Sequence, residues 1–141
     1  MRSFRQVHRA MFHLMRVEAD TLGLTPVQIM VIHAIKEEPN ISLNELADRL
    51  QMGCSTVSGV VKRLVEAKIL ERERVEEDQR TIAMRLTDKG QDLEEQAYGD
   101  DSLISQAVLR FLELPDDDLD RLLQIHQRLI DILRGETDRK S

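Results

Sequence analysis

The feature that most constrains this fold is a pair of helical segments separated by only three residues. Ser42-Leu43-Asn44-Glu45 has a hydroxyl three residues before a glutamate, which is the pattern of a capping box and predicts a helix ending near Leu50. Gly53 can begin a second helix over residues 54–68. Because residues 51–53 suffice only for a tight turn, the second helix must cross close behind the first. The two segments together predict a helix-turn-helix.

The segment 54–68 has one apolar and one polar side. The apolar positions, at helical spacing, are Val57, Val60, Val61 and Leu64. The predicted exposed positions are short near the start and cationic further along: Ser55, Thr56, Ser58, Gly59, Lys62 and Arg63. Short side chains allow close approach to base edges in a DNA major groove, and the two cations can reach phosphates. Taken singly, such residues more often cap a helix or lie on a solvated surface. Their position on a helix directly behind a second short helix instead favours a face that reads DNA.

Alternating residues over 70–75 and 81–86 predict two strands of a hairpin, joined by the charged turn 76–80. Arg72 and Arg74 share one face of the first strand. Arg80 is at the tip, where it could enter a minor groove. Asp78 is near enough to hold the Arg80 guanidinium by a charge-assisted pair, although exposed pairs of this kind are common and contribute only about 0–1 kcal/mol. We predict DNA contacts from these four residues.

Helical patterns also precede and follow this region. Apolar spacing predicts a helix over residues 1–20, and Thr25-Pro26-Val27-Gln28 predicts a second capping box with a helix to about Glu38. Thr87 can cap a long helix that residues 99–102 could kink or split. An apolar stripe predicts a last helix to about residue 134, and the polar tail 135–141 is expected to fray.

The charge distribution is compatible with DNA binding although the chain is acidic. The formal net charge is −6, yet residues 53–90 carry eight basic and seven acidic groups, whereas residues 91–141 carry six and thirteen. Phosphate attraction is screened over about 8–10 Å in physiological salt, so a local cationic face is sufficient. The aromatic content of 3% offers no stacking platform for single strands and favours duplex DNA.

Length and composition indicate one folded, highly charged domain of 141 residues that could gain stability as a dimer. No apolar run approaches the roughly 20 residues of a membrane span, and the first 15 residues lack the unbroken apolar core of a secretory signal. The single cysteine, Cys54, excludes an intrachain disulfide and a thiolate cage for zinc. We therefore expect a cytoplasmic protein with no membrane contact.

No catalytic or metal-binding spacing is found among the reactive residue types. The histidines at 8, 13, 33 and 126 include no i, i+4 pair of ligands and no evident carboxylate partner, so we expect no metal. Neither a phosphate loop nor paired carboxylates nor a nucleophile with a base occurs at an informative spacing. We expect no enzyme activity and no cofactor.

Several fragments, in order, resemble the MarR-type transcriptional regulators. They are Leu24-Thr25-Pro26-x-Gln28, Ser42-x-x-Glu45-Leu46-Ala47-x-x-Leu50, Ser55-Thr56-Val57-Ser58-x-x-Val61-Lys62-Arg63-Leu64, Asp78-x-Arg80 and Leu86-Thr87-Asp88-Lys89-Gly90. The resemblance implies one domain over 1–141, mainly α with a small β-hairpin wing over 70–86. In this arrangement a winged helix-turn-helix lobe, residues 25–86, lies between dimerisation helices over 1–20 and 87–134.

The resemblance also implies how such a chain acts. It implies an obligate homodimer on a palindromic operator, most often as a repressor, with the helix resembling 54–68 in the major groove and Arg80 in the minor groove. Two positions depart from the family pattern: Ile69 stands where a glycine commonly ends the recognition helix, and Gly53 stands where a polar cap is usual.

Many proteins of this family release DNA when a small phenolic or lipophilic compound, an oxidant or a metal arrives. Cys54 is the one redox candidate, but it lies in the DNA-reading helix, and we favour packing or exposure over sensing. Residues 11–15 could line an apolar pocket for an effector or form dimer core, and we favour core. His126, on an apolar stripe, is interpreted as an interface residue.

A winged-helix dimer that binds protein instead of DNA is the alternative function, because a fold does not determine a function. Lys62, Arg63, Arg72, Arg74 and Arg80 argue against this alternative. A protein-docking surface more often carries exposed apolar anchors.

Overall fold

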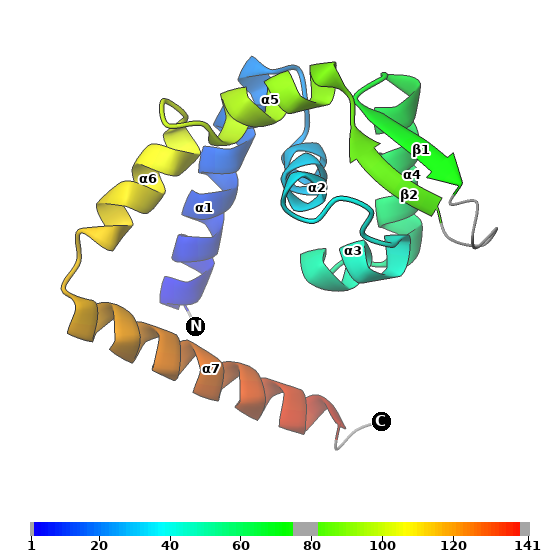
Figure 1. Ribbon diagram of the computed structural model, residues 1–141. Helices are drawn as coiled ribbons and strands as arrows, with labels where there is room; N and C mark the ends of the chain where they lie inside the picture. Colours follow the sequence, from blue (N-terminus) through cyan, green and yellow to red (C-terminus); the bar gives the residue numbers. More distant parts are fainter. Residues whose placement is uncertain (1, 75–81, 139–141) are drawn as a thin grey trace. The chain divides into compact units, whose positions relative to one another are not determined.

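The computed structural model, which describes residues 2–74 and 82–138, is mostly helical with one small antiparallel sheet (Figure 1). Its elements, in order, are α1 (Arg2–Thr21), α2 (Pro26–Glu37), α3 (Leu43–Leu50), α4 (Cys54–Glu66), β1 (Leu70–Arg74), β2 (Ile82–Leu86), α5 (Asp88–Tyr98), α6 (Leu103–Leu112) and α7 (Asp116–Asp138). The predicted fold class is confirmed. The chain forms two compact units, Met1–Ser105 and Gln106–Ser141. No helix among the described residues is long and apolar enough to cross a membrane.

Both predicted capping boxes are present. The Thr25 hydroxyl accepts from the Gln28 backbone N–H at 3.2 Å, and the Gln28 side chain accepts from the Thr25 N–H at 2.9 Å. Ser42 and Glu45 make the same reciprocal pair at the start of α3, at 3.2 and 2.9 Å. The hydrogen bonds from Ser42 lower the pKa of the Glu45 carboxyl. These bonds satisfy backbone donors that a helix start otherwise leaves unpaired.

The helix predicted over residues 54–68, which is α4, ends two residues earlier, at Glu66 and not at Lys68. Lys68 has φ +56°, its N–H donates to the Val65 carbonyl at 3.0 Å, and the Ile69 N–H donates to the Leu64 carbonyl at 2.9 Å. This is a Schellman ending with a lysine at the left-handed position that glycine usually occupies. Ile69, which departs from the family pattern, does not disturb the end of the helix, because Lys68 adopts the left-handed conformation of the turn.

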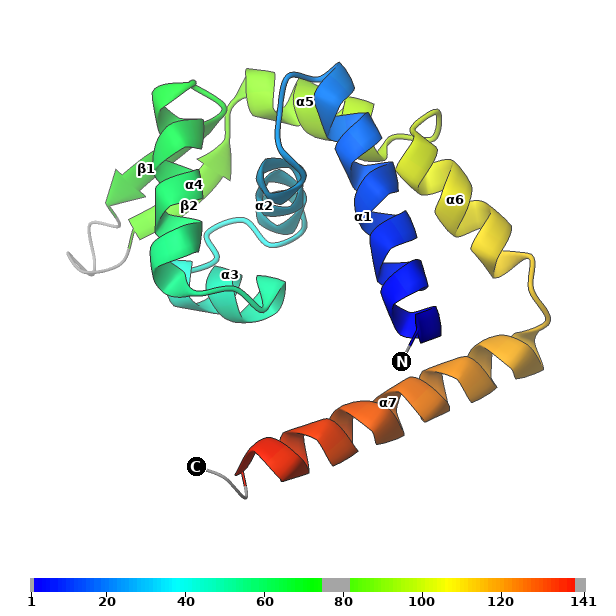
Figure 2. The ribbon, with the colours of Figure 1, turned by 180° about the vertical axis from the view of Figure 1, so that it is seen from behind.

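The lobe core is built from the apolar faces of α2, α3 and α4 and the base of the hairpin. Its fully buried members are Val31, Ile32, Ala34, Ile35, Ile41, Leu46, Ala47, Val57, Val61, Leu64, Ile69, Leu70 and Met84. Figures 1 and 2 show α3 beside the N-terminal end of α4, with α2 next to both. The short turn 51–53 makes this close crossing unavoidable, as the spacing predicts.

The hairpin pairs Leu70 with Leu86, Arg72 with Met84 and Arg74 with Ile82. The outer edge of β2 is bound by Asn40, whose N–H donates to the Met84 carbonyl at 3.1 Å. The Arg85 guanidinium in turn donates to the Asn40 side-chain oxygen at 3.1 Å. Asn40 thereby holds β2 through one backbone and one side-chain hydrogen bond.

The C-terminal half contains one confirmed and one wrong prediction. The helix begun by Thr87 is split at residues 99–102, as the glycine and acidic residues there predict. The buried Ser102 caps α6 by accepting from the Ser105 N–H at 3.1 Å, and the buried Glu18 carboxylate accepts from the Leu103 N–H at 3.0 Å. However, α7 continues to Asp138, so the tail predicted to fray from residue 135 is helical to that point. A glycine inside a helix costs only about 1 kcal/mol relative to alanine, and no proline follows to stop the helix.

Candidate nucleic-acid interface

The two sides of α4 are divided as the sequence predicts. Val57, Val61 and Leu64 are fully buried, and Val60 packs half-buried against the same core. The other side is exposed at Ser55, Thr56, Gly59, Lys62 and Arg63, with Ser58 intermediate. An outward face with short side chains in its first turns and cations beyond them can place base-reading groups close to a groove floor and charges at its walls.

The start of α4 lacks a side-chain cap, since Gly53 provides none. Cys54 is exposed at the first helical position, and its thiol lies 3.2 Å from the side-chain oxygen of Asn44 on α3. This weak contact joins the first turn of α4 to α3. Of the two alternatives favoured for Cys54, packing and exposure, the structure shows exposure, and the chain has no second cysteine for an intrachain disulfide.

The hairpin carries only part of the predicted wing site within the described residues. Arg72 is exposed on the hairpin face that bears Met84 opposite it, and the backbone of Arg74, two residues later, pairs with Ile82 at the end of β1. On the other face Glu71 is paired with Arg85, so opposite charges face each other across the strands. Asp78 and Arg80 lie outside the described residues, and their roles remain predictions.

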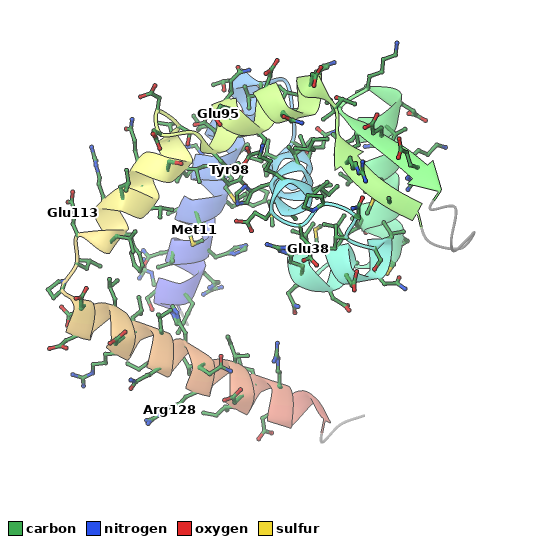
Figure 3. All side chains as sticks on the ribbon, in the orientation of Figure 1. Met11, Glu38, Glu95, Tyr98, Glu113 and Arg128 are labelled. Carbon is green, nitrogen blue, oxygen red and sulfur yellow. The ribbon has the colours of Figure 1, made fainter. Side chains whose placement is uncertain are left out.

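A cavity of about 260 Å³ lies where α1, α2, α3 and α5 meet. Its lining combines thioether, aliphatic, aromatic and charged groups: Met15, Met30, His33, Ala34, Glu37, Arg49, Leu50 and Tyr98. In Figure 3 Tyr98 extends from the last turn of α5 toward α2, where its ring stacks on His33 with centroids 3.9 Å apart and planes 14° apart. The lining thus combines an apolar surface with three ionisable side chains, those of His33, Glu37 and Arg49.

Charged contacts connect the helices around this cavity. His33 Nδ1 lies 2.9 Å from the Glu94 carboxylate on α5, and His33 Nε2 lies 3.6 Å from Glu37. Since a carboxylate only accepts, the Glu94 contact assigns the proton to Nδ1. Arg49 on α3 pairs with Glu37, and also with Glu38 at 3.2 Å. From sequence spacing no carboxylate partner was evident for any histidine, whereas His33 has two. The i, i+4 spacing of His33 and Glu37 is a signal for one partner, whereas Glu94 is 61 residues away.

The environment of Tyr98 changes its acidity. Burial, together with the negative charges of Glu94 and Glu37, raises the pKa of the Tyr98 phenol to about 12. The ring is therefore neutral throughout the physiological range. It can act as a stacking surface and a hydrogen-bonding hydroxyl, but not as an anion.

Among the residues that the structure describes, the exposed large apolar side chains lie outside the lobe. The described ones are Phe4, Val7, Met11, Phe12 and Val17 on α1; Leu103, Val108, Leu109, Phe111 and Leu112 on α6; Leu114; and Leu123, Ile125, Ile130, Ile132 and Leu133 on α7. Met11, labelled in Figure 3, is 61% exposed. So many exposed large apolar side chains are unusual on the surface of a soluble monomer and are typical of association surfaces.

Comparison with known proteins identifies relatives across most of the chain. A family model described as the MarR family matches residues 22–81. The HTH-type transcriptional regulator MgrA of Staphylococcus aureus is 31% identical over 102 residues, which cover 72% of this chain and 68% of that protein. The HTH-type transcriptional repressor MdtR of Bacillus subtilis is 29% identical over 90 residues, or 64% and 58% of the two chains. A Staphylococcus aureus MarR structure in complex with salicylate and kanamycin superposes with a TM-score of 0.74 at 23% identity, over 96% of this chain and 90% of that one.

Proposed function

The chain belongs to the MarR family of HTH-type transcriptional regulators, and from this premise we propose that it is a homodimeric repressor that binds a pseudo-palindromic operator. The observation that carries the proposal is the outward face of α4, with Ser55, Thr56 and Gly59 in its first turns and Lys62 and Arg63 beyond them. Paired readers of this type lie about one DNA turn, ~34 Å, apart. The short residues would contact bases and the cations phosphates.

Dimerisation is proposed from the apolar side chains exposed on α1, α6 and α7. Sixteen large hydrophobic residues there and in the adjoining turn are exposed, whereas the described residues from α2 to α5 contribute none to this set. Covering them with a second copy would remove apolar area from water at roughly 25 cal/mol per Å². The dimer would place two α4 helices on one face of the DNA, as the palindrome requires.

The experiment that tests the proposal is an electrophoretic shift with the promoter DNA beside the coding region of this protein. We expect salt-sensitive binding by the folded dimer. Absence of salt-sensitive binding to any duplex, under conditions where the dimer is folded, would contradict DNA binding and favour a protein-interaction module. Arg80→Ala tests the wing: a strong loss of affinity is expected if this side chain enters the minor groove, and an unchanged affinity refutes that assignment.

We also propose that the cavity beside His33 and Tyr98 takes a small apolar or phenolic effector. An aromatic ring would contact the apolar side chains there, and a carboxylate would compete with Glu37 for Arg49. Such competition would loosen α3 from α2, the support of the DNA-reading pair. Salicylate serves as the probe: it should lower operator affinity in the parent chain and in Lys36→Ala, but not in Arg49→Ala, which lacks the guanidinium for which its carboxylate would compete. An operator affinity that salicylate leaves unchanged in the parent contradicts this effector class.

A further inference from the structure

The turn that ends the recognition helix is bound by the first turn of α5. Three consecutive carbonyls, of Ala67, Lys68 and Ile69, accept hydrogen bonds from it. The Lys89 ammonium donates to the Ala67 carbonyl at 3.1 Å, and the Thr87 hydroxyl donates to the Lys68 carbonyl at 2.6 Å. The Thr87 backbone N–H donates to the Ile69 carbonyl at 3.1 Å. Figures 1 and 2 both show the start of α5 beside this turn.

The same threonine also begins α5. Its hydroxyl accepts from the Gly90 N–H at 3.2 Å while donating to Lys68, so one oxygen joins the end of one helix to the start of the next. Gly90 makes this approach possible, because a Cβ there would lie 2.2 Å from the Ile69 carbonyl oxygen. Lys89 adds a positive charge near the C-terminal end of α4, where the helix dipole favours one.

We propose that Thr87, Lys89 and Gly90 are positioning residues for DNA binding, which hold α4 at a fixed angle to α5. The other contacts of α4 are mainly apolar and non-directional, whereas these hydrogen bonds are directional and specify an angle. The inference rests on the proposed function, since the angle matters only if two copies of α4 must meet two half-sites.

A small change in the angle between α4 and α5 produces a larger displacement at the far end of α5. With 11 residues α5 is about 16 Å long, so a rotation of about 10° at its start displaces its far end by roughly 3 Å. That displacement is close to the ~3.4 Å rise of one base pair. A loosened joint should therefore show itself as relaxed selectivity for the spacing between half-sites, a property that a loss of stability alone does not alter.

The test uses the full chain and a duplex that the parent chain selects from a random library. Duplexes with the half-sites moved by one or two base pairs, and a duplex with one half-site, are then compared at one salt concentration. We expect Thr87→Val/Lys89→Met to reduce the discrimination between the best and the shifted spacings by about fivefold, the factor that one hydrogen bond contributes. Affinity for the single half-site should change by less than about twofold.

Gly90→Ala places a Cβ between α5 and the turn that ends α4, and it should therefore move the preferred half-site spacing. Gly135→Ala is the control: a Cβ there meets nothing within 4 Å, and the preferred spacing should not move. Thr21→Val/Lys36→Met is the matched control for the double variant and should keep the parent chain's discrimination between spacings. Thr87→Ser/Lys89→Arg, which retains a hydroxyl and a cation, should show the same discrimination as the parent chain. Thermal unfolding monitored by circular dichroism verifies folding, and Lys89→Met alone replaces any variant that fails to fold.

The outcomes are distinguishable. A parent chain that selects no duplex overturns the proposed function. If the parent chain discriminates sharply between spacings and the folded variants do so equally well, only the positioning role is overturned. The same holds if the variants lose affinity equally for the single half-site and for the paired half-sites.

Discussion

Individual side chains on α4 differ in what they can contribute to DNA binding. Ser55 and Thr56 are short and exposed in the first turn, whereas Lys62 and Arg63 are exposed two turns later. Contacts to phosphates provide affinity without sequence information, and contacts to base edges provide specificity. Substitutions at the two ends of this face should therefore have different signatures.

Lys62→Ala should weaken binding about equally on all duplexes. Because one phosphate contact releases about one counterion, the slope of log affinity against log salt should fall by about one. Titrations at several salt concentrations measure this slope. Lys36→Ala, which removes an exposed lysine at the end of α2, should leave the slope unchanged. A slope that stays constant in Lys62→Ala would place this ammonium away from the DNA backbone.

Tyr98 is the single tyrosine of the chain, so absorbance at the tyrosinate band reports on it alone. With a pKa of about 12 in the folded chain against 10.0 for the free side chain, its contribution to stability is complete below pH 10 and is lost as the pH rises toward 12. Glu94→Gln should lower the folded-state midpoint, because one negative neighbour is removed. Glu95→Gln, an exposed neighbour on the same helix, should not. A parent midpoint near 10 would show a solvated ring.

At the scale of elements, the ends of the helices were the hardest features to predict. The capping boxes at Thr25 and Ser42 involve neighbours three residues apart, and the sequence pattern is sufficient to identify them. Of the three left-handed turn residues, Asn40 belongs to a type that favours this backbone conformation, whereas Gln51 and Lys68 do not. Packing of Ile69 and Leu64 in one core selects the turn at Lys68, and such packing is not visible in local sequence.

Lys68→Gly should stabilise the folded chain. A left-handed lysine is strained by its Cβ, and glycine removes that strain while keeping the backbone hydrogen bonds of the turn. The expected gain in the free energy of unfolding is about 0.5–1 kcal/mol. Urea denaturation measures it, with Lys36→Gly in a right-handed helical position expected to destabilise instead. A destabilised Lys68→Gly would mean that the lysine side chain contributes more than the strain costs.

Long-range polar contacts could not be predicted either, because they depend on packing between residues far apart in the sequence. Glu18 and Glu94 are buried acids whose partners, Leu103 and His33, are 85 and 61 residues away. Sequence periodicity marks a face as apolar or polar, but does not state which distant donor will meet a carboxylate. The exposed face of α4 could be predicted because its two sides are defined within one helix.

For the whole molecule, association should depend on the apolar residues exposed on α6. We expect Leu109→Glu, at a position 58% exposed, to produce a monomer of lower stability, because a charge would be buried in the contact between copies. Sedimentation equilibrium measures the mass. Gln91→Glu, which adds the same charge at an exposed polar position of α5, should remain dimeric. A dimeric Leu109→Glu would exclude this part of α6 from the interface.

The contact between Glu18 and the start of α6 also bears on the order in which the chain folds. The core of the lobe closes within residues 31–84, whereas the Glu18 carboxylate must wait for a donor 85 residues further along. That donor, the Leu103 N–H, follows the last core residue, Met84, by 19 residues, which take roughly 1–4 s at synthesis rates of about 5–20 residues per second, and small domains commonly fold within that time. The lobe can therefore form on the ribosome while the first helix still lacks its last partner.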